Sequence, residues 1–599
     1  MSTTVTQAAN PSGNVVTTTT DPVTGVIELS VDTESYPRNR IVKKGSRLMD
    51  VTNATGWTKS GAGNVFSVTP EWSRRSANSL KIDMMSASAD AIVEWSNATG
   101  ITVDPVDKLL AFDLYIPELV NTDTVGGISI NIFLSNTTSY SAPGTTFILN
   151  SNYLRQGVNE IRLCGKDADG ALGSYRGTGT LPHGMSKAGA GGGSNPLNWA
   201  NPIKYISIQI SRVASNPRIF YMDEIRIPDK IKPFFCLGFD ASGSTQTDDI
   251  FLTRTAPFLK ANNIPCYFTT TIDYDGAFWG TQDDLRKGTL YSDYKWDAIN
   301  HSWSHGAGSA GKIFSSGNSL VVSGGGTLAT LTLGSAHLWT LGTPLLLAVA
   351  GATGASAAGC NGVQLVTPTT TNAVTFPITG GADGTATGTI KAGTRFSDVL
   401  NSVAQTNQPI VLSAQKLSAL MKHEIRGVKN YPLARGWLRG QEFMAYPNNA
   451  PPDMRLMEPE AAAAGIKLAR GSNGTTCRVS TFGVDNPLNL PSTDLSSGSV
   501  YGSTITDITN ALQGALNRGE GLFVFGHYLR DEALDAVVDI NSPPGMNGNP
   551  PAPGSSSTEL WWYAGQLEKL LTTVVIPKRD AGELDFLSAS NCVDVLTTI

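Results

Sequence analysis

The stretch "KPFFCLGFD", residues 232–240, decides the fold of the second half of the chain. It is a short apolar run that ends in an aspartate, and similar runs recur as "IPCYFTTTI" (264–272), "WDAIN" (296–300), "EFMAYP" (442–447) and "LFVFGH" (522–527). Segments that suit helices, such as "LSAQKLSALMKHEIRGV" (412–428), separate these runs. Strands that alternate with helices predict a parallel sheet with helices outside it, as a barrel or a doubly wound sheet.

Residues 29–230 have a different hydrophobic pattern. Runs such as "AIVEWS" (91–96), "ISINIFL" (128–134) and "IFYMDEIRI" (219–227) alternate apolar with polar residues and are separated by turn residues. This pattern predicts an antiparallel β-sandwich. Its final run "IFYMDEIRI" resembles the last strand of carbohydrate-binding jelly rolls, which implies a jelly-roll-like domain that would bind carbohydrate; as the alternative, the domain would be a spacer or a trimer contact. Residues 1–28 are rich in Thr, Ser and Asn, so we expect a flexible N-terminal arm there.

A segment without charge interrupts the alternating region. Between Ile313 and Ala382 no side chain is charged, and runs such as "SLVVSGGGTLATLTLG" (319–334) are typical of strands and turns. We therefore assign residues 307–405 to an all-β insertion. The uncharged stretch 338–359 is broken by Gly and Pro and falls short of the ~20 strongly apolar residues that a membrane span requires.

The bulk composition excludes several function classes. A net charge of -6 without Lys/Arg clusters argues against a nucleic-acid partner. The six cysteines have no CxxC spacing, so neither a thiolate zinc site nor a dense disulfide framework is indicated. The N-terminus lacks a basic start followed by an apolar run, so we expect no secretory signal and synthesis in a cytoplasm.

Titratable side chains lie where the predicted strands end. Asp240 ends the first run, His301 and His305 follow "WDAIN", and His527 ends "LFVFGH". In a barrel such strand ends meet at one rim, where catalytic groups gather. Two imidazoles four residues apart suit Zn²⁺, an aspartate can take a proton from water, and a histidine can protonate a leaving group. This set of groups suits the hydrolysis of an amide or an ester.

Four motifs in order resemble those of the NodB-homology polysaccharide deacetylases (carbohydrate esterase family 4). They are "LGFDASG" (237–243), "HSWSH" (301–305), "FMAYPNNAPPD" (443–453) and "LFVFGH" (522–527). The resemblance implies a distorted (β/α)7 barrel built from residues 231–306 and 406–599. It also implies a divalent metal, Zn²⁺ in the first place, and the removal of acetyl groups from bacterial surface polysaccharide.

The resemblance assigns roles to individual residues. It places Asp240 as general base, His527 as general acid, and His301 and His305 as metal ligands. Tyr446, Pro447, Asn448, Trp303 and Arg470 are the residues that we expect to bind substrate.

The third metal-ligand position of the family is occupied by Ala241, and a methyl group cannot coordinate a cation. Four alternatives stay open: a weaker metal site, substitution by Asp248 or Asp249, a non-catalytic glycan binder, or an alanine introduced to trap an inactive form. The third motif also lacks the arginine that many relatives place beside the base, with Met444 and Ala445 there instead.

Two further stretches resemble phage tail proteins. The insertion sequence is similar to small β modules of tail fibres, and "DPVTGVIELS" (21–30) is similar to leaders of tail proteins. These resemblances imply a tailspike or tail-fibre enzyme in the virion, with other tail proteins and acetylated polysaccharide as partners and a homotrimer as one expected assembly. A purely structural virion component is the third hypothesis, beside the enzyme and the glycan binder.

Overall fold

The computed structural model describes residues 41–597 with gaps, and it also assigns the strands β1 (Val5–Ala9), β2 (Val15–Thr20) and β3 (Ile27–Asp32), which pair as a small antiparallel sheet. The gaps are 52–55, 61–63, 85–89, 118–127, 151–153, 155–156, 169–184, 190–195, 213–217, 241–249, 271–279, 303–312, 338, 340, 343, 394–424, 426–431, 447–460, 472–478, 481–482, 485–486, 489, 496–503, 535–538 and 542–560. The side chains of the predicted arm at residues 1–28 lie outside the described part of the chain, and the flexible arm stays a prediction.

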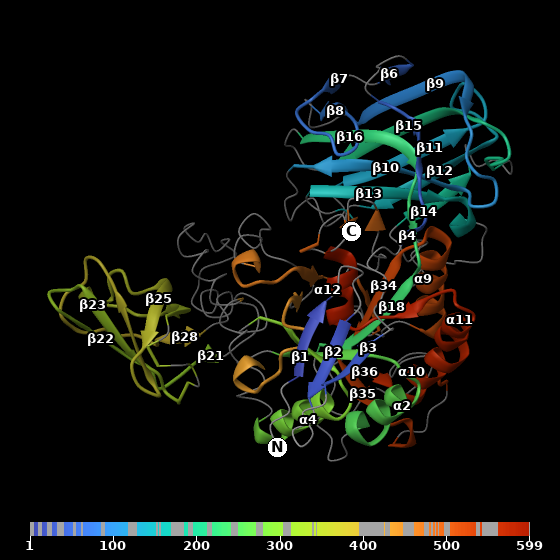
Figure 1. The fold of residues 1–599 in the computed structure, drawn as a ribbon. Helices are drawn as coiled ribbons and strands as arrows, with labels where there is room; N and C mark the ends of the chain where they lie inside the picture. Colours follow the sequence, from blue (N-terminus) through green and yellow to red (C-terminus); the bar gives the residue numbers. More distant parts are fainter. Residues whose placement is uncertain are drawn as a thin grey trace.

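Residues 46–227 form two antiparallel sheets that face each other (Figure 1). One has the order β13-β10-β16-β8-β7, with β5 beside β16, and the other has the order β14-β12-β11-β15-β9-β6. The strands are β5 (Ser46–Met49), β6 (Trp57–Ser60), β7 (Asn64–Thr69), β8 (Ser79–Met84), β9 (Ala91–Ile101), β10 (Leu109–Ile116), β11 (Ile128–Ser135), β12 (Gly144–Asn150), β13 (Gly157–Cys164), β14 (Met185–Gly189), β15 (Ile203–Arg212) and β16 (Arg218–Ile227).

Period-two alternation explains why these runs form a double layer. In β15, Ile206, Ile208 and Ile210 are buried in the shared core, while Ser207 and Gln209 lie between them and point to the other face. The inward residues of both sheets make one hydrophobic cluster, so neither sheet could be stable without the other.

A mainly parallel sheet forms the second body. Its order is β30-β29-β20-β19-β18-β34-β33, with β37 beside β18. The strands are β18 (Phe234–Phe239), β19 (Cys266–Thr270), β20 (Asp297–Asn300), β29 (Phe443–Ala445), β30 (Leu468–Arg470), β33 (Thr493–Asp494), β34 (Gly521–Gly526) and β37 (Asp585–Phe586). Its helical segments are η4 (Phe251–Thr255), α2 (Ala256–Ala261), α4 (Gly280–Ser292), α9 (Ile505–Arg518), α10 (Ala564–Leu570), η10 (Leu571–Val575), α11 (Ile576–Asp580) and α12 (Ala589–Thr597).

One segment connects the two ends of this sheet. Leu490 forms a parallel bridge with Arg470 of β30, and a few residues later β33 pairs with β34. Ala469 N donates to Pro487 O at 2.8 Å, and Leu490 N donates to Ala469 O at 2.7 Å. The segment that ends in β33, the last strand in the order, thus also contacts β30, the first strand. The expected distorted (β/α)7 barrel is compatible with these contacts and stays a prediction; below, this body is called the parallel domain.

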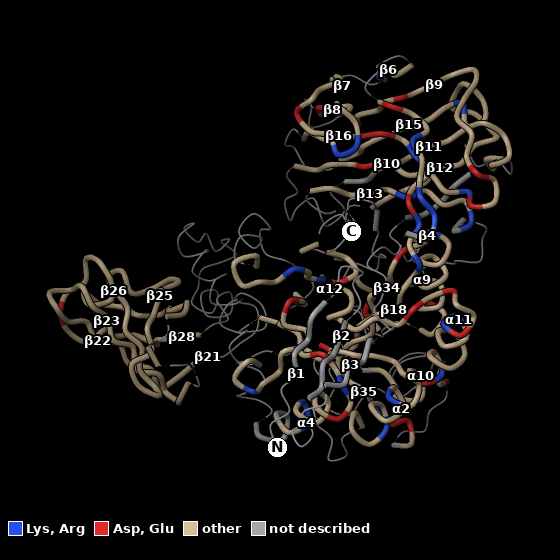
Figure 2. Tube along the Cα trace, viewed as in Figure 1, with Lys and Arg blue, Asp and Glu red and all other residues tan. Residues whose placement is uncertain are grey.

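Residues 313–393 form a separate eight-stranded sheet. Its order is β21-β28-β24-β25-β26-β23-β22-β27. The strands are β21 (Ile313–Phe314), β22 (Ser319–Ser323), β23 (Leu328–Thr332), β24 (Leu345–Ala350), β25 (Gly362–Pro368), β26 (Ala373–Pro377), β27 (Gly384–Thr385) and β28 (Lys391–Gly393). Figure 2 shows how few charged residues this module carries compared with the other two bodies.

The module is not isolated from the parallel domain. Leu346 and Ala348 of β24 belong to the same hydrophobic cluster as Ile425, Met444 and Tyr446. Asn300, at the end of β20, donates from Nδ2 to Ile425 O at 3.0 Å. The inserted sheet is therefore anchored beside strand ends of the parallel sheet. In the described part of the chain, no helix is long and apolar enough to cross a membrane.

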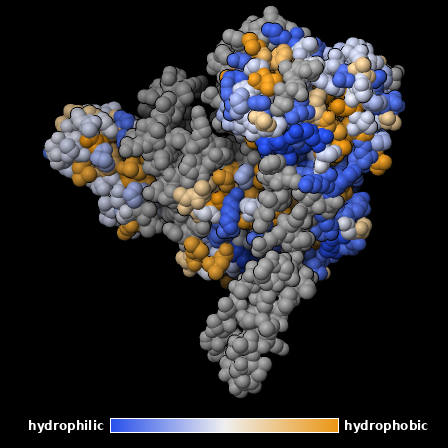
Figure 3. Space-filling view, turned by 45° about the horizontal axis from the view of Figure 1, so that its top comes forward, coloured by the Kyte–Doolittle hydropathy of each residue, from blue (hydrophilic) through white to orange (hydrophobic). Residues whose placement is uncertain are grey.

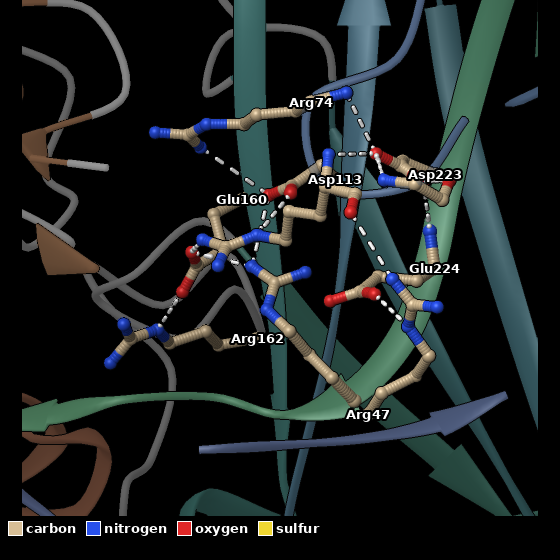
Figure 4. Close-up of polar contacts among 10 residues, drawn as sticks. Arg47, Arg74, Asp113, Glu160, Arg162, Asp223 and Glu224 are labelled. Carbon is tan, nitrogen blue, oxygen red and sulfur yellow. Dashed lines mark hydrogen bonds and ion pairs between the residues drawn. The ribbon is translucent and has the colours of Figure 1, made fainter. Parts of the chain in front are cut away.

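A network of buried ion pairs occupies the outer face of the β13-β10-β16 sheet, next to the parallel domain (Figure 4). Asp113 is bound by Arg75 at 2.8 Å and by Arg226 at 3.0 Å. Glu160 is bound by Arg226 at 2.6 Å and by Arg162 at 2.5 Å. Burial by itself would raise the pKa of Glu160, but the surrounding guanidinium groups hold that pKa well below its usual range.

Arg162 carries this network across to the parallel domain. Its Nη1 donates to Arg518 O at 2.7 Å, at the end of α9, and its Nε lies 3.8 Å from a carboxylate oxygen of Glu520. All three side chains are buried. In the space-filling view of Figure 3, strongly hydrophilic residues gather where the sandwich meets the body below it. The sandwich is thus fixed to the parallel domain by directional contacts and not only by a linker.

We expect Arg162→Met to lower the free energy of unfolding by about 3–5 kcal/mol, because it leaves Glu160 and Glu520 buried without this cation. Chemical denaturation followed by tryptophan fluorescence would measure the change. Lys578→Met is the matched control, since its ion pair with Glu583 is exposed and should be worth less than about 1 kcal/mol. Equal effects of the two substitutions would contradict the assignment.

A second prediction concerns Asp107, which binds Lys43 and Lys230 (2.8 Å). Desolvation raises its pKa, but hydrogen bonds to Lys230 and Lys43 lower it from 3.8 to about 2. Since the folded pKa is the lower one, this stabilisation is complete above the unfolded value and is lost as the pH falls through the folded value. Asp107→Asn should therefore cost about 1–2 kcal/mol at pH 7, and the difference from the unmodified chain should shrink below roughly pH 4.

Denaturation curves recorded between neutral and acid pH would measure that difference. Asp580→Asn, at an exposed pair with Arg579, is the control and should show no such gap. A gap for Asp107→Asn that stays constant at all pH values would count against the ion pairs as its cause.

Candidate functional site

Polar side chains lie at the carboxyl ends of the central parallel strands. Asp240 follows β18, His301 follows β20, Arg470 ends β30 and His527 follows β34. Asp240 N donates to Gly526 O at 2.8 Å, so the ends of β18 and β34 lie side by side. Because parallel strands have their carboxyl ends at one edge, the four side chains converge on the same rim.

Asp240 forms a buried ion pair with Arg470. Arg470 donates from Nη2 to Oδ1 of Asp240 and from Nε to the hydroxyl of Tyr267, the latter at 2.7 Å. The guanidinium also lies over the ring of Phe525, 3.9 Å from its centroid. Burial opposes the charge of Arg470, yet the Asp240 carboxylate keeps its pKa above the ordinary value. The arginine thereby fixes one carboxylate oxygen and leaves Oδ2 as the oxygen that can take a proton.

A glycine in β18 makes room for this arrangement. A Cβ at Gly238 would lie 2.1 Å from the ring of Tyr267, so any side chain there would displace the tyrosine. Tyr267 is fully buried, and burial raises the pKa of its hydroxyl well above the usual value. The hydroxyl therefore stays protonated and accepts the hydrogen bond from Arg470. The glycine of "LGFD" thus supports the aspartate two residues later.

His301 is buried and held in one orientation. Its Nδ1 lies 2.9 Å from Ala445 O, and its backbone N–H donates to Thr270 O at 3.0 Å. Since a carbonyl oxygen can only accept, Nδ1 carries the proton and Nε2 has the lone pair. Burial first, and the charge of Arg470 as a smaller cause, lower the pKa of His301 to about 3, although the hydrogen bond to Ala445 acts in the opposite direction. The imidazole is therefore neutral at pH 7, as a metal ligand requires.

The chain turns sharply after His301. Ser302 has a φ of 66°, a conformation that few residues other than glycine adopt. Asn300 stabilises the turn, because its Oδ1 accepts a hydrogen bond from Ser302 N at 2.8 Å. The strand end at His301 is thus set by its neighbours on both sides.

His527 and Tyr446 occupy different environments. The ring of His527 is half-buried and lies 5.7 Å from the ring of Phe525, in an edge-on arrangement. An electrostatic influence of His527 is among the smaller causes that lower the pKa of His301, so the two imidazoles lie near each other. Tyr446 is buried, and its hydroxyl donates to Leu488 O at 2.6 Å. Its predicted role in substrate binding stays a prediction.

The structure brings together Asp240, His301, His527 and Arg470. Several other predicted site residues lie outside the described residues: Ala241, Asp248, Asp249, Trp303, His305, Pro447 and Asn448. Among the residues that are described, no group of three or more His, Cys, Asp or Glu could hold a metal ion. The lone pair on Nε2 of a neutral His301 has the chemistry of a zinc ligand, so the donor that is described fits the expected metal.

The role of Arg470 is the feature that the sequence did not indicate. It was expected to bind substrate, and that stays a prediction, but its described contacts are with Asp240, Tyr267 and Phe525. An arginine at the end of the apolar run "IKLARG" needs a buried counterion, and Asp240 was the available carboxylate. The third motif, on β29, has Met444 and Ala445 and no arginine beside the aspartate. Arg470 of the neighbouring strand β30 provides a guanidinium there instead.

No protein-family model matches the chain, and no curated protein does. Solved structures show partial likeness. A family 11 carbohydrate-binding module from Clostridium thermocellum, in complex with a mixed-linked tetrasaccharide, is 12% identical over 31% of this chain and 96% of its own, with a TM-score of 0.20. A β-1,2-glucanase from Parabacteroides distasonis is 14% identical over 30% of this chain and 24% of its own, with a TM-score of 0.20.

The enzymatically active domain of tailspike protein 4 from Bacteriophage CBA120 is also similar in part. It is 11% identical over 30% of this chain and 20% of its own, with a TM-score of 0.17. Scores of this size establish neither a shared fold nor a shared function.

We expect Arg470→Met to destabilise the chain by about 3–5 kcal/mol, because Asp240 would remain buried without its counterion. Lys467→Met is the matched control, since the ion pair of Lys467 with Glu442 is exposed and should contribute less than about 1 kcal/mol. Urea denaturation of both variants would measure the difference. A cost for Arg470→Met no larger than that of the control would show that the pair does not hold the rim together.

Proposed function

We propose that this chain is a metal-dependent deacetylase that removes acetyl groups from bacterial surface polysaccharide, and that it acts as part of a phage tailspike. The observation that carries the proposal is the set at one rim: a carboxylate oriented by Arg470, a neutral His301 with a fixed tautomer, and the half-buried His527. A base, a metal ligand and an acid on the ends of parallel strands suit acyl-group hydrolysis. We further propose the distorted (β/α)7 barrel as the fold of residues 231–306 and 406–599.

Each described residue has one task in this reaction. Asp240 takes the proton of the attacking water through Oδ2, while Arg470 holds Oδ1 and so fixes the direction of the carboxylate. His527, half-buried at the adjacent strand end, gives a proton to the departing amine or alcohol. Tyr267 and Phe525 contact Arg470 and position it without contact to substrate.

A divalent cation, Zn²⁺ in the first place, would be held by His301 and His305. When bound it lowers the pKa of water and stabilises negative charge on the acyl oxygen. Ala241 offers no ligand, so a carboxylate such as Asp248 or Asp249 would have to complete the set.

A glycan-binding protein without catalysis is the second candidate, and Ala241 is the observation that favours it. A site with two histidines and no third protein ligand would bind a cation weakly. On this reading the rim would recognise polysaccharide, and the hydrolytic step would be lost.

Acetate release decides between the two candidates. The whole chain with Zn²⁺ should release acetate from N- or O-acetylated bacterial polysaccharide. Asp240→Asn, once thermal unfolding has shown that the variant is folded, should lower the rate at least about 100-fold, the scale of a lost general base. Asp293→Asn, an exposed aspartate of the same domain, is the control and should leave the rate unchanged.

The substitution Ala241→Asp tests the metal site separately. It should tighten zinc binding, measured by titration with a competing chelator, and should raise the rate of acetate release. No acetate from the chain or from Ala241→Asp, on N- and O-acetylated substrates alike, would refute the deacetylase and leave the glycan binder and the structural virion component.

A further inference from the structure

One face of the sandwich combines aromatic rings with oriented polar side chains. It is the outer face of the sheet β14-β12-β11-β15-β9-β6, here called the outer sheet face. The register places the outward side chains in rows across the strands: Thr146, Phe133, Ser207, Glu94 and Thr58 in one row, and Ile148, Asn131, Gln209 and Ile92 in the next. The parallel domain is joined through Arg162 of β13, which belongs to the other sheet.

A cluster of three aromatic rings, in tilted and edge-on contacts, lies at one end of this face. Tyr140, in the loop after β11, has its ring centroid 4.1 Å from that of Phe133, and Phe133 lies 6.1 Å from Tyr205. Phe133 and Tyr205 are buried, whereas Tyr140 is 59% exposed. Tyr140 therefore presents a large part of an aromatic side chain to solvent, on a base of two further rings. Such a flat apolar face suits the C–H side of a sugar ring.

The loop that carries Tyr140 is anchored on both sides. Asn136 donates from Nδ2 to the carbonyl oxygens of Asn198 and Pro202 at 3.1 and 3.0 Å, and its Oδ1 accepts from Asn198 N at 2.9 Å. Ser135 donates to Ser141 O at 2.7 Å. Little conformational entropy would be lost when a ligand settles on Tyr140, because the loop is already ordered.

Polar side chains continue the outer sheet face beyond the rings. Tyr205 donates its hydroxyl hydrogen to Glu94, and Gln209 donates from Nε2 to Asp90 at 2.6 Å. Glu94, Asp90 and Gln209 are half-buried, so they retain solvent contact while they are oriented. Carboxylate oxygens can accept several hydrogen bonds each, and sugar hydroxyls and ammonium groups are donors that match them.

The charge of the face limits the class of glycan. Its described outward side chains at the paired positions include the carboxylate of Glu94, with Asp90 beside them, and contain no lysine or arginine. A polysaccharide that carries carboxylate, sulfate or phosphate groups would be repelled, whereas neutral or amine-bearing sugars would not.

We propose that the outer sheet face is a glycan-binding site for neutral or amine-bearing polysaccharide, separate from the rim of Asp240 and His301. Tyr140 stacks on one sugar ring, and Glu94, Gln209 and Asp90 accept or donate hydrogen bonds to its neighbours. The site would hold the chain on a polymer, and it does not depend on the proposed hydrolysis.

Binding is best tested in full-length Asp240→Asn, so that hydrolysis does not consume the probe and failure of the deacetylase proposal has no bearing on the result. The probes are hexamers of N-acetylglucosamine, of glucosamine and of glucose, with a galacturonic acid hexamer as the acidic probe. Isothermal titration should detect at least one of the first three and not the acidic one. Binding to none of the first three, or tighter binding of the acidic probe, would overturn the proposal.

Substitutions then locate the site. Tyr140→Ala and Glu94→Gln should each weaken binding about 10-fold or more, and Tyr140→Phe, which keeps the ring, should bind like the parent. Val106→Ala is the matched control, since Val106 is a 72% exposed apolar residue elsewhere on the sandwich. Thermal unfolding would show that each variant is folded. Unchanged binding in folded Tyr140→Ala and Glu94→Gln would place the glycan elsewhere and refute the assignment.

Discussion

The ion pair between Asp240 and Arg470 is the constraint around which the candidate site is organised. Neither side chain has solvent to stabilise its charge, so each requires the other. The pair joins β18 to β30, which have three other strands between them in the sheet order, and Tyr267 of the intervening strand β19 supports it. In Asp240, Oδ1 binds Arg470, and Oδ2 is the oxygen that can accept a proton.

Buried ion pairs also connect the sandwich to the parallel domain. The sandwich meets the parallel domain through Arg162, Glu160 and Glu520, all buried, and the large hydrophobic clusters of the described residues belong to one body or the other. Buried ion pairs add little net stability, but they are directional and costly to break singly. The inserted sheet is attached by apolar packing instead, because side chains of β24 join a hydrophobic cluster with Met444 and Tyr446. Both additions are thus attached to the parallel domain by contacts beyond the chain connections.

The local sequence pattern predicts strands well, but it does not predict which side chains distant in sequence will contact each other. The runs around residues 234–239, 266–270 and 521–526 are strands because apolar residues without helical spacing are bounded by turn residues, and all this is visible in sequence. The convergence of Asp240, His301 and His527 was also predictable, since each follows such a run. The partner of Asp240 was not, because Arg470 lies 230 residues away and only the pairing of strands brings it there.

The same limit of sequence-based prediction applies to the outer sheet face. Period-two alternation predicts which side chains of β11 and β15 point outward, and so could identify Phe133, Ser207 and Gln209 as one surface. It cannot predict that a loop residue, Tyr140, closes over Phe133, because that contact depends on hydrogen bonds from Asn136 to a segment some 60 residues later. Strand residues give such a surface its chemistry, and an anchored loop gives it its shape. Where the two coincide on the outer sheet face, recognition of a ligand explains the arrangement better than packing does.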